Sequence, residues 1–523
     1  MSNSPPLISK RLLYFTVFIG GMSTLAIEFT ISRILQTVYG TSNIVWANVI
    51  GLVLFFLTVG YFLGGRLADR RPESRIFFSL ITLAGFSSIF FLLLSSFLVK
   101  QTATALATFN SSVIIGSFVG VIIGLAIPIT LLGMVSPFAI RLAVTTVEQA
   151  GRISGQIYAI STLGSLLGTW LPVLIVIPLA GSRMTAIIFG GILFALGLFG
   201  LWYSNGRLDL AALIFVLIPA VWAFGFGNLT DRGDAIYETE SAYNYIQVIR
   251  RDPCNYLLLN EGAAFHSFYC DDGSLPAVSV WSSMLAGPYF YPPDQFNSPK
   301  NMLVIGLAGG TVPQQFLRIF PDLAVIGIEP DPAIIEVGQT YFALSDPRIQ
   351  PIVGDGRFEL NQINKQFDVI TIDAYKVPYI PWHLTTVEFF EEVSTKLTDR
   401  GIVAINVGRV PNDRRLVEAL TATLETVFPT VHTADIPGSL NTILYATAQP
   451  TSANGLVLHI TQLPKDEDPL LPAVLSAVQS GLRPSVGSEI IFTDDVAPVE
   501  TIVDSLVLRY LVQSGLQGLP TTE

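Results

Sequence analysis

The chain has 523 residues, of which 51% are hydrophobic and only 13% are charged. Soluble proteins carry about 25% charged residues, so this composition argues against a disordered chain and against an ordinary soluble enzyme. The 2 cysteines exclude a disulfide-dense scaffold and a cysteine-rich metal site. Residues 1–230 hold 12 Lys and Arg against 5 Asp and Glu, and residues 231–523 hold 17 against 35. The two parts, with net charges of +7 and −18, are therefore expected to fold in different surroundings.

Residues 1–230 are expected to form a helical membrane domain. A helix that crosses a bilayer needs about 20 mostly apolar residues. Seven such stretches are present, at 12–35, 44–65, 76–99, 112–136, 153–178, 184–203 and 208–226. Arginines concentrate in residues 66–75, and Lys10 and Arg11 precede the first stretch, as is typical of cytoplasmic segments. Seven crossings predict the second part on the opposite side, an orientation that one miscounted crossing would reverse.

Two features of this domain have more than one interpretation. Residues 65–71, GRLADRR, resemble the loop between the second and third helices of major facilitator superfamily transporters, but a positively charged cytoplasmic loop is an equal alternative. Glu28 and Arg33 lie inside the first apolar stretch, where charges usually face a bundle interior or a cavity. Glu28 is a candidate cation site, and a charge pair near the membrane edge is the favoured alternative.

The second part begins an α/β pattern at residue 301. An apolar strand at 301–305 leads directly into a glycine-rich turn that starts at Gly306, followed by a helix at 312–320. A second strand at 324–328 ends at Glu329. In such units the glycines let a nucleotide approach the backbone, and the acid accepts hydrogen bonds from ribose hydroxyls. The pattern predicts a nucleotide or nucleoside site.

Two further acids follow predicted strands. Asp355 comes after a strand at 349–353, and Asp373 comes after a strand at 367–372; a later strand is expected at 402–407. Ligands of open α/β sheets bind at the carboxyl ends of strands, so these acids are candidate site residues, although each is also a candidate helix cap. The 4 histidines have no metal-ligand spacing, and no metal is expected.

The motifs of the second part resemble the spermidine synthase family of polyamine aminopropyltransferases. The matching segments are ESAY at 240–243, VIGLAGG at 304–310, IEPDP at 328–332, DPRIQPIVGDGR at 346–357, FDVITIDAY at 367–375 and HLTT at 383–386. The first part is similar to the membrane segment of bacterial proteins that fuse such a domain to a helical bundle. The resemblance implies an S-adenosylmethionine methyltransferase-like, Rossmann-like fold at 296–450. A β-rich lead-in with a hairpin at 231–295 precedes it, and a C-terminal extension at 451–523 follows.

The resemblance also implies roles for individual residues. Glu329 would hold ribose hydroxyls, Asp355 would accept from the adenine amino group, and Asp373 would be the catalytic acid that orients and deprotonates an amine. The remaining candidates are the cofactor-binding Gly306 and Gly356 and the substrate-binding Asn244, Tyr375 and Tyr379.

The chain departs from the family mainly on the amine side. Gly309 and Lys376 stand where the family commonly has aspartates, and Trp281 and Ser282 align with its Tyr-His pair. Asn244 aligns with its N-terminal glutamine. The nucleoside half of the site therefore matches better than the half that would bind a polycation.

The two cysteines give a structural prediction. Residues 256–259 and 265–269 are expected to form a hairpin in which Leu259 pairs with Phe265, a register that also places Cys254 opposite Cys270. That register favours a disulfide, which is typical of an oxidising compartment. Two reduced thiols in an intracellular sheet are an equal alternative.

These inferences predict a multi-pass protein of the cell (inner) membrane that carries a transferase domain. It is expected to move an aminopropyl or related group from decarboxylated S-adenosylmethionine, or S-adenosylmethionine, to an amine. The alternatives are a transport or sensing protein with a degenerate nucleoside-binding domain, and a methyltransferase. The expected partners are the thioadenosine nucleoside, the amine, the lipid bilayer and a second copy in a homodimer. The strong acidity of the second part argues against nucleic acid.

Overall fold

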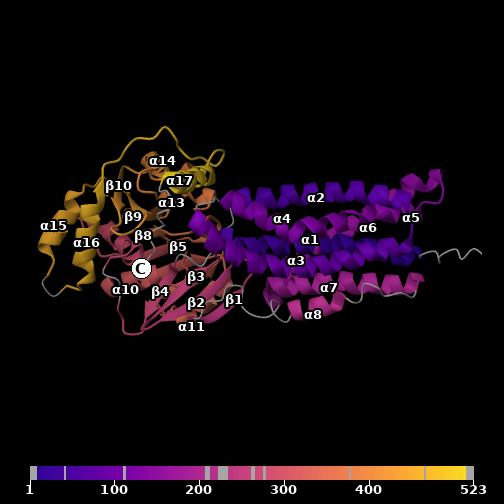
Figure 1. Ribbon diagram of the computed structural model, residues 1–523. Helices are drawn as coiled ribbons and strands as arrows, with labels where there is room; N and C mark the ends of the chain where they lie inside the picture. Colours follow the sequence, from indigo (N-terminus) through magenta and orange to yellow (C-terminus); the bar gives the residue numbers. More distant parts are fainter. Residues whose placement is uncertain are drawn as a thin grey trace, which may run out of the picture.

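The structure is a computed structural model that describes residues 9–39, 43–109, 113–205, 213–221, 234–260, 265–274, 278–375, 379–464 and 467–513. Long helices form a bundle in the first part of the chain, and the second part forms an α/β unit beyond one end of that bundle (Figure 1). The N-terminal helix begins at the bundle end that lies farther from the α/β unit.

The described bundle helices are α1 (Lys10–Tyr39), α2 (Asn43–Arg70), α3 (Ser74–Phe109), α4 (Val113–Gly133), α5 (Val135–Ala143), α6 (Ala150–Leu171), α7 (Ile177–Asn205) and α8 (Ile214–Ala220). Glycines allow close packing between them, because an added Cβ at Gly168 of α6 would lie 2.0 Å from the carbonyl oxygen of Met22 in α1. Gly164, one turn earlier, approaches Phe18 at 2.1 Å in the same way. Small residues that let backbones meet are typical of helix packing in membranes.

Within the described residues, five helical stretches are long and apolar enough to cross a membrane: Lys10–Ile34, Trp46–Arg70, Ser74–Phe91, Phe118–Ala143 and Val147–Ser204. The last stretch has 58 residues and contains Gly181 at φ +79°, where the helical dihedrals are interrupted. The chain turns there, and α6 and α7 run as separate rods (Figure 1). The first six predicted apolar stretches therefore coincide with helices. The seventh, 208–226, falls partly outside the described residues, and its described helix α8 has 7 residues.

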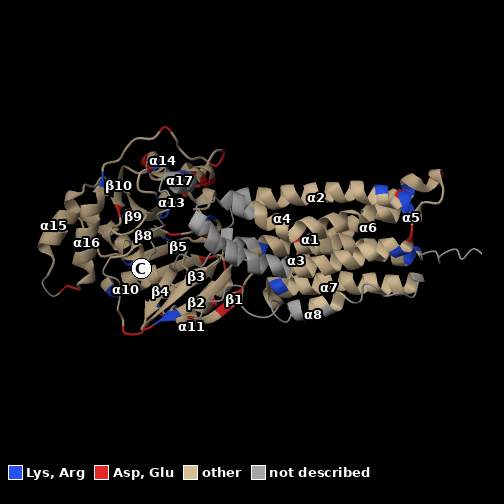
Figure 2. Ribbon diagram, viewed as in Figure 1, with Lys and Arg blue, Asp and Glu red and all other residues tan. Residues whose placement is uncertain are grey.

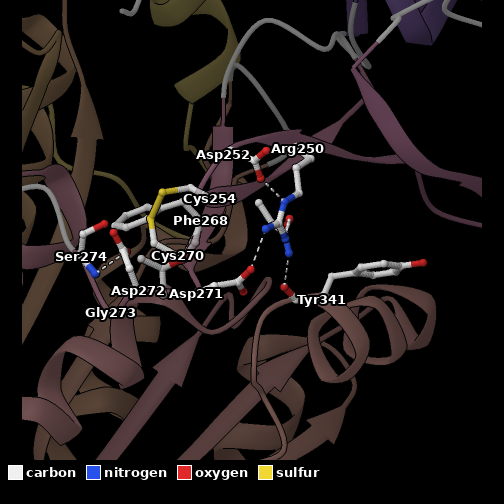
Figure 3. Close-up of a disulfide and its surroundings, with 12 residues drawn as sticks. Arg250, Asp252, Cys254, Phe268, Cys270, Asp271, Asp272, Gly273, Ser274 and Tyr341 are labelled. Atoms are coloured by element: carbon white, nitrogen blue, oxygen red, sulfur yellow. Dashed lines mark hydrogen bonds and ion pairs between the residues drawn. A yellow bond between two sulfur atoms is a disulfide. The ribbon is translucent and has the colours of Figure 1, made fainter.

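Four antiparallel strands form a small sheet in the order β1-β2-β3-β4. They are β1 (Ala235–Glu240), β2 (Tyr245–Arg251), β3 (Cys254–Leu259) and β4 (Phe265–Cys270). Cys254 pairs with Cys270 in the predicted register, and the two form a disulfide beside the ring of Phe268 (Figure 3). The predicted pairing of Leu259 with Phe265 is wrong, because a register shift after Leu257 places Phe265 opposite Leu258.

The larger sheet has eight described strands in the order β12-β10-β11-β9-β8-β5-β6-β7. They are β5 (Asn301–Ile305), β6 (Ala324–Glu329), β7 (Ile349–Val353), β8 (Phe367–Ile372), β9 (Leu397–Gly408), β10 (Thr430–Asp435), β11 (Asn441–Thr447) and β12 (Leu482–Arg483). Strands β5 to β9 pair in parallel, and β9 to β12 pair antiparallel. The sheet is therefore mixed, and the predicted Rossmann-like architecture is confirmed.

Helices cover both faces of this sheet. They are α9 (Val280–Ser283), α10 (Thr311–Ile319), α11 (Pro332–Tyr341), α12 (Gly356–Gln362), α13 (Val387–Thr395), α14 (Arg415–Glu425), α15 (Asn454–Gln462), α16 (Leu470–Gly481) and α17 (Val499–Gln513). Alternating strand residues supply two cores: Met302 and Val304 face α10 and α16, whereas Leu303 and Ile305 face α13 and α14. This alternation follows from the two-residue period of a strand, and it leaves the carboxyl ends of β5, β6 and β8 side by side.

Candidate active site

The glycine-rich turn after β5 places its own backbone at the carboxyl ends of the parallel strands. Gly306 has φ +90°, and an added Cβ there would lie 2.5 Å from the carbonyl oxygen of Asp373. Only glycine fits this conformation and this contact without strain. The next turn residues are held from the small sheet, because the N–H of Gly309 donates to Oγ of Ser267 in β4 at 2.8 Å. The lead-in sheet thus forms one wall of the site.

Glu329 is the last residue of β6, and its side chain is only 6% exposed. Its carboxylate accepts hydrogen bonds from the N–H of Ala308 at 3.0 Å and from the N–H of Asp331 at 3.2 Å. Burial raises the pKa of Glu329 to about 7, although both N–H groups act in the opposite direction. A buried acceptor therefore lies at the glycine turn, in the position that the spacing predicts.

Asp331 was not predicted as a site residue, yet it ties the small sheet to Glu329. It is fully buried, caps α11 through the N–H of Ala333, and accepts from Oγ of Ser241 at 2.6 Å. It also accepts from Nδ2 of Asn244 at 2.9 Å, while Oδ1 of Asn244 accepts from Asn260. Both amide atoms of Asn244 are therefore used within the protein, where they join the small sheet to Asp331.

Asp355 lies at the end of β7 and has two structural partners. One carboxylate oxygen caps α12 by accepting from the N–H groups of Arg357 and Phe358, and the other lies 2.9 Å from Nε2 of His383. Burial alone would raise the pKa of Asp355, but these hydrogen bonds and the His383 charge lower it overall. Asp355 therefore caps a helix while it stays at the carboxyl end of β7. Gly356 begins α12, and an added Cβ there would lie 2.5 Å from Ile305.

Asp373 follows β8 beside the glycine turn, with its N–H donating to the carbonyl of Ile305 at 2.9 Å. Nδ2 of Asn406, in β9, donates to Oδ1 of Asp373 at 2.9 Å. The indole of Trp281 also acts on this carboxylate and favours its ionised form. Burial raises the pKa of Asp373, and these two donors oppose the shift. Trp281 and Asn406 are functional candidates that the sequence analysis missed.

The two predicted tyrosines belong to the scaffold through their hydroxyl groups. Tyr375 donates to the carbonyl of Asn406 at 3.1 Å and accepts from the N–H of Gly408 at 2.8 Å. Tyr379 is buried and donates to Asp504 of α17. The structure therefore brings together Gly306, Glu329 and Asp373, while these hydroxyl groups hold neighbouring segments in place. Lys376 lies outside the described residues.

Polar contacts connect the helical bundle to the turn between β1 and β2. Arg33 of α1 donates to the backbone carbonyls of Ser241 and Ala242, which neither interpretation of the sequence anticipated. Glu240 accepts from the N–H and hydroxyl groups of Ser182 in α7. The β1–β2 turn is thus held on one side by the bundle and on the other by Asp331.

The described residues contain no group of three or more His, Cys, Asp or Glu side chains placed to hold a metal ion.

Residues 288–453 match the spermine/spermidine synthase domain. A probable polyamine aminopropyl transferase of Bifidobacterium longum is 29% identical over 314 residues, which cover 56% of this chain and 67% of that protein. The polyamine aminopropyltransferase of Vibrio vulnificus is 28% identical over 205 residues, which cover 38% and 61%. An eEF1A lysine and N-terminal methyltransferase of Danio rerio is 30% identical over 176 residues, which cover 31% and 25%.

Solved structures also show similarity. A probable spermidine synthase from Corynebacterium glutamicum has 20% sequence identity and a TM-score of 0.38, with coverage of 49% of this chain and 98% of that chain. A spermidine synthase in complex with the transition-state analogue AdoDATO has 18% identity and a TM-score of 0.37, with coverage of 47% and 85%. The domain match and the aminopropyltransferase relatives identify the α/β part as a polyamine aminopropyltransferase-like transferase domain.

Proposed function

We propose that this protein is a membrane-anchored transferase that moves an aminopropyl group from decarboxylated S-adenosylmethionine to an amine. One observation carries the proposal: the glycine turn at Gly306, the buried acceptor Glu329 and the half-buried acid Asp373 meet at one edge of the sheet. A nucleoside and a nucleophile need these groups within reach of one another.

The nucleoside would lie across the ends of β5, β6 and β7. Glu329 would accept hydrogen bonds from both ribose hydroxyls, and Gly306 leaves room for the sulfur-bearing tail of the donor. Asp355 keeps the acceptor capacity of a carboxylate, because its lowered pKa leaves it ionised at neutral pH, and it would accept from the adenine amino group. Gly356 keeps α12 close to β5 and so preserves the shape of this wall.

Group transfer would take place beside Asp373. A neutral amine attacks the aminopropyl carbon that is bonded to the sulfonium, so a C–N bond forms as the C–S bond breaks and methylthioadenosine leaves. Asp373 would orient the amine and accept its proton. Burial raises the pKa of this carboxyl, which brings it nearer to the working pH of a general base. Trp281 and Asn406 would hold the carboxylate toward the acceptor.

The bundle would anchor the domain in the cell membrane. Arg66, Arg70, Arg71 and Arg75 lie at the end of α2, at the start of α3 and in the loop between them, and Figure 2 shows Lys and Arg gathered at the bundle end farther from the α/β unit. Cytoplasmic loops are rich in arginine and lysine, so the α/β unit would lie on the opposite, non-cytoplasmic side. The disulfide agrees with that side.

Methyl transfer is a second candidate, because an eEF1A lysine and N-terminal methyltransferase also resembles the chain. The two reactions use different donors at the same nucleoside site. Binding of a nucleoside without any transfer would instead favour a sensing or transport protein with a degenerate domain.

The test uses the full-length protein in lipid nanodiscs. Calorimetry would compare methylthioadenosine, S-adenosylmethionine and its decarboxylated form, and mass spectrometry would detect transfer to a panel of amines. We expect preference for the decarboxylated donor, loss of binding in Glu329→Ala, and a rate loss of about 100-fold or more in Asp373→Asn with binding retained. Asp346→Asn removes a surface ion pair with Arg348 and serves as the matched control. Full activity of Asp373→Asn would contradict the proposed mechanism.

A further inference from the structure

A group of arginines lies at the same sheet edge as Asp373. Arg409 directly follows β9, the strand next to β8. Its guanidinium, together with those of Arg414 and Arg483, surrounds the single carboxylate of Asp435 at the end of β10, at 3.2, 2.6 and 3.2 Å. We call Arg409, Arg414, Arg483 and Asp435 the arginine cluster.

Side-chain hydrogen bonds connect the arginine cluster to Asp373. Asn406 donates to Asp373 and accepts at Oδ1 from Asn441 at 2.8 Å. Ser439 donates to Oδ1 of Asn441, and its carbonyl accepts from Arg409 at 3.3 Å. Asp435, the carboxylate at the centre of the cluster, ends β10, which lies three strands from β8, or about 14 Å at the usual strand spacing. The cluster therefore lies on the β9 side of Asp373, where the amine substrate would bind, away from Glu329.

The charge of the cluster is not balanced within the described residues. Three guanidiniums share one carboxylate, which also accepts from the hydroxyl of Thr442, so a net charge of about +2 remains. Neighbouring Asp413 is itself matched by two arginines, Arg415 and Arg509, and contributes no surplus negative charge.

Arg409 has the least solvent to offset this charge, because its side chain is only 14% exposed. Its Nε is buried and makes no hydrogen bond of good geometry, although it lies 3.2 Å from Asp435. Burial and the charges of Arg414 and Arg483 lower the pKa of Arg409, whereas Asp435 acts in the opposite direction. A partly buried excess of positive charge is costly unless an anion offsets it.

We propose that the acceptor is an amine that also carries a carboxylate, with the amine at Asp373 and the carboxylate at the arginine cluster. Planar guanidiniums match carboxylates by paired hydrogen bonds. A polycation would place its distal ammonium against like charge at this position. The inference rests on the proposed function and specifies its acceptor class.

Binding of matched acceptors tests the inference without requiring turnover. Full-length protein saturated with methylthioadenosine would be titrated with ω-amino acids and with α,ω-diamines of the same length. The pairs are 6-aminohexanoate against 1,6-diaminohexane, and 8-aminooctanoate against 1,8-diaminooctane. We expect at least one amino acid to bind about tenfold or more tightly than its diamine. Arg409→Gln should abolish that preference, Arg409→Lys should retain part of it, and the surface control Arg348→Gln should leave it unchanged.

The inference would be overturned if the diamines bound as tightly as the amino acids or more tightly. It would also be overturned if the preference survived Arg409→Gln, or if none of the four compounds bound. A separate assay of aminopropyl transfer from decarboxylated S-adenosylmethionine distinguishes failure of this inference from failure of the proposed function. Transfer to diamines without the amino-acid preference leaves the function intact and removes the inference. The preference without transfer to any acceptor leaves the carboxylate site intact and removes the transferase proposal.

Discussion

Glu329 determines how nucleoside binding should depend on pH. Burial raises its pKa to about 7, so the carboxyl is largely protonated below that pH and ionised above it. Ribose hydroxyls donate to the ionised form, and below pH 7 binding must first release a proton. We therefore expect affinity for methylthioadenosine to rise by nearly tenfold per pH unit between about 5 and 7, and to level off above 7.

Calorimetry from pH 5 to 8.5 measures this dependence directly. The Glu329→Gln variant provides the control, because its side chain does not titrate and its affinity should be weak and independent of pH. Affinity that stays constant in the unsubstituted protein, or falls as pH rises, would contradict the assignment of Glu329 to the ribose.

Trp281 offers a second test at residue scale, because its indole lowers the pKa of Asp373. Its ring also packs against Phe268 with 5.4 Å between centroids. Trp281→Phe keeps an aromatic ring in this position but removes the indole donor. A donor to a carboxylate favours its ionised form, so the pKa of Asp373 should rise further. The acid limb of the kcat profile should move to higher pH, with about a tenfold lower rate at neutral pH.

The kcat–pH profile of Trp281→Phe distinguishes this role from a purely structural one. A fold defect would lower the rate at every pH without moving the limb, and methylthioadenosine binding serves as the folding control. An unchanged limb would show that the indole donor does not act on the titrating group.

The disulfide gives a prediction at the scale of the β3–β4 hairpin. Cys254 and Cys270 are 16 residues apart, and closing a loop of this size is worth about 3 kcal/mol in the chain-entropy model. Their sulfurs pack with Phe268 against Trp281, so the bond supports the wall that holds Asp373. The Cys254→Ser/Cys270→Ser variant should lower the melting temperature of the α/β unit by several degrees.

Thermal unfolding with and without reductant measures the contribution of the disulfide. Reductant should lower the melting temperature of the unsubstituted protein to that of the double variant and should not change the variant itself. If reductant lowered the melting temperatures of both proteins by the same amount, the disulfide would not be the cause of the decrease.

Local patterns in the chain predicted several elements correctly, because burial and turn chemistry act over short distances. Parallel strands buried on both faces appear as apolar runs, which located β5 and β8, and the glycine turn fixed Gly306. The bulge near Phe265 was missed because one extra residue leaves little trace in such a pattern. Strand β9 begins at Leu397 rather than at residue 402, since its polar first residues hide the extension.

The site was predictable only where it follows the end of a single strand, as for Glu329 and Asp373. The partners of Asp373 come from segments that meet only in the folded chain: Asn406 is 33 residues away, and Trp281 lies before β5 altogether. In the sequence, Trp281 appeared only as a departure from the Tyr-His pair of the resembled family, whereas in the fold its indole acts on the carboxylate of Asp373. Hydroxyl partners of Tyr375 and Tyr379 likewise depend on strand β9 and helix α17, which no local pattern specifies.

At the scale of the whole molecule, a continuous set of hydrogen bonds runs from the bundle to the nucleoside side of the site. Arg33 donates to the carbonyls of Ser241 and Ala242. The hydroxyl of Ser241 donates to Asp331, whose N–H donates to Glu329. The bundle therefore contributes to the position of Glu329 in addition to its proposed anchoring role, and a change in α1 should alter nucleoside affinity.

Arg33→Gln in the full-length protein tests this coupling. Losing one or two charge-assisted hydrogen bonds, each worth about 1.5–3 kcal/mol locally, should weaken methylthioadenosine binding by about threefold to tenfold, because only part of that energy reaches Glu329. Arg33→Lys should restore most of the affinity, and Ser241→Ala should reproduce the loss by removing the donor to Asp331. Arg141→Gln breaks an ion pair with Asp69 in the bundle and should leave binding unchanged. Equal affinity in Arg33→Gln and the unsubstituted protein would show that the bundle and the nucleoside site act independently.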